Sequence, residues 1–126
     1  MASTSLFPYE KIRPEQDGLI RDIYDAVSNG KCMIAHAPTG LGKTAASLAP
    51  ALEYALKAKK TVFFLTSRHT QHAIAVETAK LIKQRHKANF SVTDIVGKKH
   101  MCARDDVSAL SGRQFYDYCN SLVDTG

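Results

Sequence analysis

The residues with the clearest chemistry are the run APTGLGKT at positions 37–44. Gly40 and Gly42 let backbone amides turn toward a phosphate, because no Cβ blocks the approach. Lys43 would reach the β- and γ-phosphates, and the Thr44 hydroxyl would hold magnesium, which prefers oxygen ligands. The run therefore predicts a nucleotide site with Lys43 and Thr44 as its catalytic residues. The residues expected to contact the nucleotide here are Pro38, Thr39, Gly40, Leu41, Gly42, Lys43 and Thr44.

This loop is expected between a buried strand and a helix. Residues 32–35 form an apolar run that ends at a turn over 38–40, which is typical of a buried strand in which Cys32 acts as a small hydrophobic residue. A helix is predicted from about Gly42 to Ala58. Its apolar face comprises Ala45, Leu48, Leu52 and Ala55. Pro50 predicts a kink or a break in this helix, because proline removes a backbone hydrogen bond and clashes with the preceding turn.

The rest of the chain alternates in the same way. Further helices are predicted over 14–27 and 70–86, strands over 61–66 and 91–96, and one more short helix within 111–123. The helix over 70–86 is expected to bury Ile74, Leu81 and Ile82. Strands that alternate with helices favour an α/β fold with a parallel sheet and functional loops at the carboxyl ends of the strands. We therefore expect a parallel-sheet P-loop NTPase fold that is incomplete within this chain.

Size and composition exclude several classes of protein. The chain has 126 residues, 44% of them apolar, which suits one domain. Its apolar runs are far shorter than the roughly 18 residues of a membrane span, and the N-terminus lacks the pattern of a secretion signal. We expect a cytoplasmic protein, or a nuclear one in a eukaryote. Three cysteines in such a compartment argue against a disulfide framework.

The charge is concentrated in the middle of the chain. The formal net charge is +5, but residues 26–104 carry 13 basic and 3 acidic side chains, a balance of +10. Such a block suits a polyanion such as nucleic acid, because each neutralised phosphate releases counterions. A solvated, lysine-rich helix surface would give the same count, so charge alone leaves both interpretations open.

Four segments together resemble one family. APTGLGKT looks like motif I of superfamily 2 helicases, whose motor domain is RecA-like. FPYEKIRPEQ, residues 7–16, resembles the adenine-recognition segment of the XPD-like iron-sulfur DNA helicases. TSRHTQ, residues 66–71, is similar to their motif Ia, and GKKHMC, residues 97–102, looks like the entry to their iron-sulfur domain. The resemblance covers nearly the whole chain in order.

The resemblance implies roles for residues outside the loop. Arg13 and Gln16 would flank the adenine, and Tyr9 or Phe7 would stack near it, unless both rings only pack under the first helix. The residues that would hold the phosphates of single-stranded DNA are Ser67, Arg68 and Thr70. Arg68 could also be an ordinary surface arginine. His69 and His72 lack further ligands at suitable spacing and are taken as surface residues or as residues next to the DNA.

The resemblance also implies an iron-sulfur cluster. Cys102 and Cys119 would be its first two ligands, whereas a 4Fe-4S cluster takes four cysteine thiolates. Residues 1–97 would then belong to the motor domain and residues 98–126 to the beginning of the cluster domain. With only two ligands present, we expect these cysteines to lie apart, in a locally unstable segment.

The expected function is that of the N-terminal piece of an ATP-dependent DNA helicase. Asp94 lacks the paired acid that an ATPase of this class needs, so the chain alone should be inactive. The intact parent would couple ATP hydrolysis, with Mg²⁺, to unwinding of single-stranded or forked DNA, in a role that relates to repair. The residues also leave open another P-loop NTPase, of the kinase or GTPase class, or a non-catalytic nucleic-acid-binding module. The sequence does not identify any protein partner.

Overall fold

A computed structural model describes residues 4–124, except for the side chains of His69 and Asp124. The chain divides into two compact units, Met1–Val92 and Thr93–Gly126, and each is described by itself.

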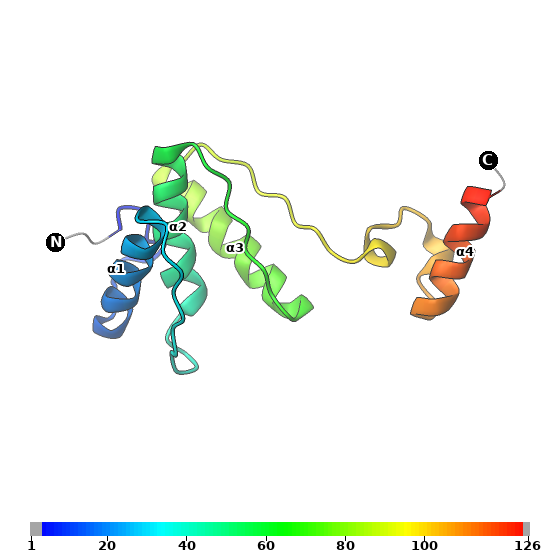
Figure 1. Cartoon of the computed structure of the whole chain (residues 1–126), viewed down its shortest axis with the longest axis horizontal. Coiled ribbons are helices and arrows are strands. Elements are labelled where there is room, and N and C mark those ends of the chain that lie inside the picture. The colour runs from blue at the N-terminus through cyan, green and yellow to red at the C-terminus, as the bar shows by residue number, and fades with distance from the viewer. Residues whose placement is uncertain (1–3, 125–126) are drawn as a thin grey trace. The chain divides into compact units, whose positions relative to one another are not determined.

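Three helices form the first unit. They are α1 (Pro14–Ser28), α2 (Lys43–Ala58) and α3 (His69–His86), and α2 packs against both of the others (Figure 1). These bounds confirm the three helices predicted from apolar spacing. The core lies between the helices and is built from Phe7, Ile20, Ala45, Ala46, Leu48, Ala49 and Ile82.

Helix α2 continues through Pro50, so of the predicted kink or break, the break is wrong. Proline inside a helix costs about 3 kcal/mol, because one backbone hydrogen bond is lost. Pro50 is fully buried, and the predicted apolar face is buried with it: Ala45, Leu48 and Ala55 are all inaccessible, and Leu52 packs against the core. We infer that this burial offsets the lost hydrogen bond and keeps the helix continuous.

No β-strand forms within residues 4–124, which contradicts the three predicted strands. Residues 32–35, 61–66 and 91–96 instead run as extended chain outside the helices (Figure 1). Cys32 is exposed, not buried as expected. A strand exists only when a neighbouring strand accepts and donates its backbone hydrogen bonds, and the described residues supply no such neighbour.

Without a partner strand among the described residues, the segment 61–66 leaves apolar side chains exposed to solvent. Phe63 is 82% exposed and Leu65 is 89% exposed. Val62 and Thr66, at alternate positions, are partly covered. This alternation is the period of a strand whose one side rests on its own chain and whose other side faces solvent.

Helix α3 is only partly buried. Ile82 is fully buried, as predicted, but Ile74 is 51% exposed and Leu81 is 43% exposed. Thr78 and Ala79 are buried in their place. The helix packs on α2, and Ile74 and Leu81, which were expected to be buried, remain accessible.

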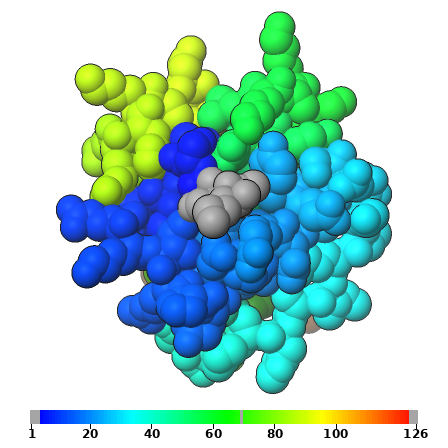
Figure 2. All heavy atoms as spheres, turned by 90° about the vertical axis from the view of Figure 1, so that its left-hand side faces the viewer, coloured from blue at the N-terminus to red at the C-terminus, as the bar shows by residue number. Residues whose placement is uncertain are grey.

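The N-terminal segment, residues 4–7, is bound to the helices by polar contacts. Glu53 on α2 accepts hydrogen bonds from Thr4 Oγ1 at 2.5 Å and from the Ser5 backbone N–H at 2.9 Å. At the other end of the segment, a ring nitrogen of His86 lies 2.8 Å from the Phe7 carbonyl oxygen. Figure 2 shows this segment, in dark blue, beside the yellow-green residues that end α3.

The second unit contains two short 3-10 helices, Lys98–Met101 and Asp105–Val107, followed by α4 (Gly112–Asp124). Helix α4 confirms the predicted C-terminal helix. Val107 and Phe115 are each 2% exposed and form the small interior of this unit. Among the described residues, no helix is both long and apolar enough to cross a membrane.

Candidate functional site

The loop over residues 37–44, called the phosphate loop below, has the backbone conformation that its glycines predict. Gly40 and Gly42 adopt positive φ angles of 85° and 80°, in a region that residues with a Cβ rarely occupy. Gly42 caps the N-terminus of α2, so Lys43 and Thr44 open that helix. The first N–H groups of a helix and its partial positive charge both favour an anion. This end of α2 therefore has the local features of a phosphate site.

The Lys43 side chain contacts the beginning of its own loop. Its Nζ donates to the carbonyl oxygens of Ala37 at 3.0 Å and Pro38 at 2.8 Å, so the side chain reaches back over the loop that precedes it. The side chain is also exposed to solvent. Its ammonium group therefore lies within the loop and is accessible to a phosphate that exchanges for these carbonyls.

Arg13 and Gln16 contact the loop directly. Arg13 Nη1 donates to the Gly40 carbonyl oxygen at 3.0 Å, and Gln16 Nε2 donates to the Leu41 carbonyl oxygen at 2.6 Å. Gln16 is only 5% exposed. The family resemblance implied that both residues flank the adenine. The sequence gave no sign of these two contacts, because they join segments that are far apart along the chain.

The two aromatic candidates differ in accessibility. Phe7 belongs to the core, so its ring packs under the helices, as the alternative interpretation held. Tyr9 is 50% exposed and meets Phe7 edge to face, with ring centroids 5.8 Å apart. Tyr9 is therefore the ring with a free surface for stacking.

The candidate DNA-binding residues lie together at the start of α3. Ser67, Arg68 and Thr70 are all exposed. Arg68 caps the helix in extended conformation, and the Gln71 backbone N–H donates to its carbonyl oxygen at 3.0 Å. Hydroxyl groups, a guanidinium and a helix N-terminus are all groups that bind phosphate. His72, in the first turn of this helix, is partly exposed.

Cys102 and Cys119 line the same cavity, so the expectation that they lie apart is wrong. The cavity has a volume of about 480 Å³ and lies within the second unit. Its other lining residues are Val96, Lys98, Met101 and Phe115. The pKa of Lys98 is raised, chiefly because its ammonium donates to the Cys119 sulfur. Packing around Phe115 brings together two cysteines that the sequence separates by a polar stretch.

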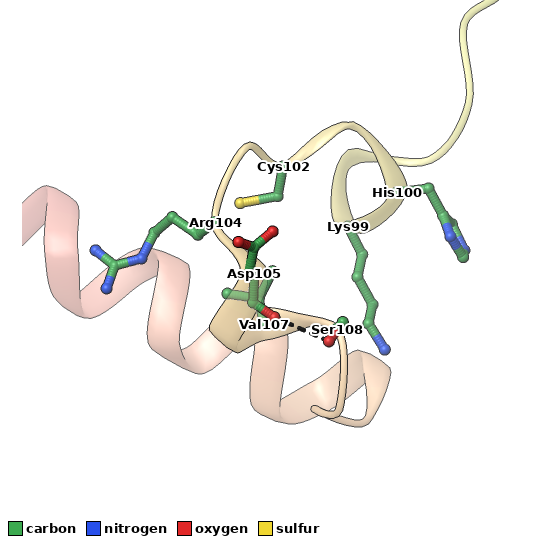
Figure 3. A pocket seen from close by; sticks show the side chains of 7 residues that line it. All are labelled: Lys99, His100, Cys102, Arg104, Asp105, Val107 and Ser108. Carbon is green, nitrogen blue, oxygen red and sulfur yellow. Dashed lines mark hydrogen bonds between the residues drawn. The ribbon is translucent and has the colours of Figure 1, made fainter.

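These two thiols do not complete a cluster site by themselves. Within residues 4–124, no group of three or more His, Cys, Asp or Glu side chains could hold a metal ion. Cys102 also borders a second hollow of about 350 Å³, where Ser108 Oγ donates to the Asp105 carbonyl oxygen at 2.9 Å (Figure 3). The described part of the chain thus supplies two candidate ligands of the four that a 4Fe-4S cluster requires.

The comparisons with known proteins find helicases, which agrees with the nucleotide site predicted from residues 37–44. The family model for DEAD/DEAH box helicases matches residues 13–125. A probable ATP-dependent helicase of Methanocaldococcus jannaschii is 33% identical over 98 residues, which is 78% of this chain and 14% of the relative. The general transcription and DNA repair factor IIH helicase subunit XPD/RAD3 of Saccharomyces cerevisiae is 28% identical over 111 residues, 82% of this chain and 14% of the relative.

The chain therefore spans 14% of the length of either relative. No solved structure matches it. The family match extends over both units and includes the phosphate loop, which favours a helicase over the kinase, GTPase and non-catalytic alternatives. The chain belongs to the DEAD/DEAH box helicase family.

Proposed function

We propose that this chain carries the ATP-binding loop and a single-stranded DNA contact of an ATP-dependent DNA helicase. The observation that carries the proposal is the loop at the start of α2, where Gly40 and Gly42 take positive φ angles and Lys43 follows at the helix N-terminus. This arrangement binds phosphate through backbone amides and one lysine. Membership in the helicase family supports ATP as the nucleotide.

In this proposal each nucleotide-binding residue has one task. Lys43 neutralises the β- and γ-phosphates, and Thr44 holds the magnesium ion, which screens phosphate charge when it is bound. Tyr9 offers an exposed ring for the base. Hydrolysis needs an acidic motif and an arginine from further motor segments, so the chain alone binds ATP without turning it over.

Single-stranded DNA would bind at the start of α3. Ser67, Arg68 and Thr70 would contact backbone phosphates, which fix the position of a strand without reading its sequence. The balance of +10 over residues 26–104 adds a long-range attraction for the same polyanion. Contacts of this kind suit a protein that moves along DNA.

The XPD-like assignment and the parallel sheet belong to the same proposal. In the intact parent, residues 1–97 would belong to the motor domain, and Cys102 and Cys119 in residues 98–126 would be the first two ligands of a 4Fe-4S cluster. The extended segments at 32–35, 61–66 and 91–96 would pair with further strands of a P-loop sheet. The position of both thiols on one cavity and the 28% identity to the yeast XPD/RAD3 subunit support this assignment.

Magnesium-dependent binding of a fluorescent ATP analogue tests the proposal. The wild-type chain should bind the analogue more tightly with Mg²⁺ than with a chelator, and phosphate release should stay at the buffer background. Thr44→Val should remove most of the difference that Mg²⁺ makes, because the hydroxyl ligand is lost while the size of the side chain is kept. Thr61→Val, at an exposed position outside the loop, is the matched control. Binding that is absent, or indifferent to both Mg²⁺ and Thr44, would contradict the proposal.

A further inference from the structure

The last turn of α3 holds the two residues that precede Tyr9. Arg85 Nη1 donates to the Pro8 carbonyl oxygen at 3.3 Å. His86 Nε2 lies 2.8 Å from the Phe7 carbonyl oxygen, and because a carbonyl oxygen only accepts, the histidine ring donates there. The partners are 77 and 79 residues apart along the chain. Two consecutive carbonyl groups of the N-terminal chain are thus bound by adjacent side chains at the end of one helix.

The backbone of residues 7–8 has few other ways to move. The Phe7 ring is 5% exposed and belongs to the core. Pro8 fixes its own φ at about −65° and restricts the residue before it to extended conformations. The main torsion that remains is ψ of Pro8, which turns the Pro8 carbonyl and the following peptide nitrogen together, because the peptide group is planar. A donor that holds the Pro8 carbonyl therefore sets the direction in which the chain continues to Tyr9.

The Tyr9 ring is anchored on one side and open on the other. It meets Phe7 edge to face, with ring centroids 5.8 Å apart and an interplanar angle of 72°. Half of Tyr9 remains exposed, which is the surface that the proposed ATP site offers to the base. The position of this surface therefore depends on the buried ring of Phe7 and on the course of the backbone between the two aromatic residues.

We propose that Arg85 and His86 are positioning residues that hold Tyr9 in place for the nucleotide base. This inference rests on the proposed ATP site and extends it to the end of α3. The two side chains act through the backbone of residues 7–9 and need no contact with the nucleotide. Their loss should therefore weaken the binding of a phosphate compound that has a base and leave one without a base unaffected.

The test compares the affinity of the chain for Mg-ATP and for magnesium pyrophosphate, which has no base. Arg85→Met keeps a long side chain and removes the donor, at a position that is exposed. We expect the affinity for Mg-ATP to fall about two- to tenfold, as for the loss of one hydrogen bond, and the affinity for pyrophosphate to stay at the wild-type value. Lys80→Met removes the same charge from an exposed site on α3 and is the matched control, which should change neither affinity.

The histidine is tested by loss and rescue. His86→Leu should lower the affinity for Mg-ATP alone, because the donor to the Phe7 carbonyl is gone. His86→Gln keeps a side-chain N–H and should restore most of the loss. Pyrophosphate binding at the wild-type level in each variant also shows that the phosphate loop is still folded.

A double-mutant cycle shows whether the effect passes through Tyr9. In a Tyr9→Ala background, Arg85→Met should cause no further loss of Mg-ATP affinity, since no ring is left to position. An equal loss for both probes, or losses that add in the double variant, would overturn the inference and leave the nucleotide site in place. Wild-type protein that binds neither probe would remove the proposed function, and this inference with it.

Discussion

Lys43 Nζ lies 2.8 Å from the Pro38 carbonyl oxygen, within the loop that both residues belong to. In the proposed ATP site, the ammonium is held where a phosphate would arrive, and it would need only a change of partner to bind one. A cation already in place loses less side-chain freedom on binding than one recruited from solvent. In that proposal, the contact would prepare the loop for an anion.

Replacement of this lysine should have a large effect on nucleotide binding. We expect Lys43→Ala to weaken Mg-ATP binding by about tenfold to a hundredfold, the range given by the loss of one charged hydrogen bond of about 1.5–3 kcal/mol. Titration with a fluorescent ATP analogue measures this. Lys80→Ala, at an exposed site on α3, removes the same charge far along the chain and should have little effect. Equal affinities of wild type and Lys43→Ala would contradict the assigned role.

Binding to single-stranded DNA should depend steeply on salt and little on sequence. Because Arg68 is exposed at the start of α3, Arg68→Ala should reduce the slope of log affinity against log salt by about one phosphate contact. Titration by fluorescence anisotropy at several salt concentrations gives the slope. The control is Arg21→Ala, because Arg21 is engaged with Asp17 on α1. If the slope is the same in wild type and Arg68→Ala, Arg68 is an ordinary surface arginine that makes no phosphate contact.

Stability should fall in acid partly through Glu53. Burial raises the pKa of this carboxyl, but hydrogen bonds from Lys57, Thr4 and Ser5 outweigh burial and lower the pKa below its ordinary value of 4.5. A carboxyl with a lowered pKa stabilises the fold above its unfolded pKa, and this stabilisation is lost as the pH falls through the folded pKa. The thermal midpoint of wild type should therefore drop more steeply below about pH 5 than that of Glu53→Gln.

Thermal melts followed by circular dichroism from about pH 7 to about pH 3 make this comparison. Glu77→Gln, at an exposed position on α3, is the control, and its melting curves should follow those of wild type. Parallel pH profiles for wild type and Glu53→Gln would show that the N-terminal segment does not depend on this carboxylate.

The second unit should owe its order to Phe115. This ring is 2% exposed and lines the cavity that also contains Cys102 and Cys119. Phe115→Ala should cost about 3–5 kcal/mol within a small unit and should abolish the hydrogen-exchange protection of α4. Protection of α1 and α2 should remain, because they belong to the other unit. Tyr116→Ala, at a neighbouring exposed ring, is the control, and persistent protection of α4 in Phe115→Ala would contradict the assignment.

Local pattern was sufficient to predict the helices. Apolar spacing placed α1, and the glycines of the loop placed the start of α2. The conformations of Gly40 and Gly42 also follow from residue type, because few other residues adopt positive φ. These features depend on residues close together along the chain, which a sequence displays directly.

Features that depend on distant partners could not be predicted in the same way. The run at 61–66 has the composition of a strand, but composition cannot supply the neighbouring backbone that a strand requires. The burial expected for Ile74 failed for the same reason. Contact between Gln16 and Leu41, and the shared cavity of Cys102 and Cys119, likewise arise from packing between separate elements.

The open side of residues 61–66 has a consequence for how such a protein is made. Phe63 and Leu65 are uncovered, and the segment TVFFLT carries no charge and no proline, which is the composition of sequences that aggregate through strand pairing. If further strands of the parent pair with this segment, as proposed above, the segment waits uncovered until they are made, because a ribosome adds about 5–20 residues per second. During that delay, chaperones and other nascent chains compete for the same backbone edge. In such a parent, we expect the rate of translation past this segment to influence how much protein reaches the folded state.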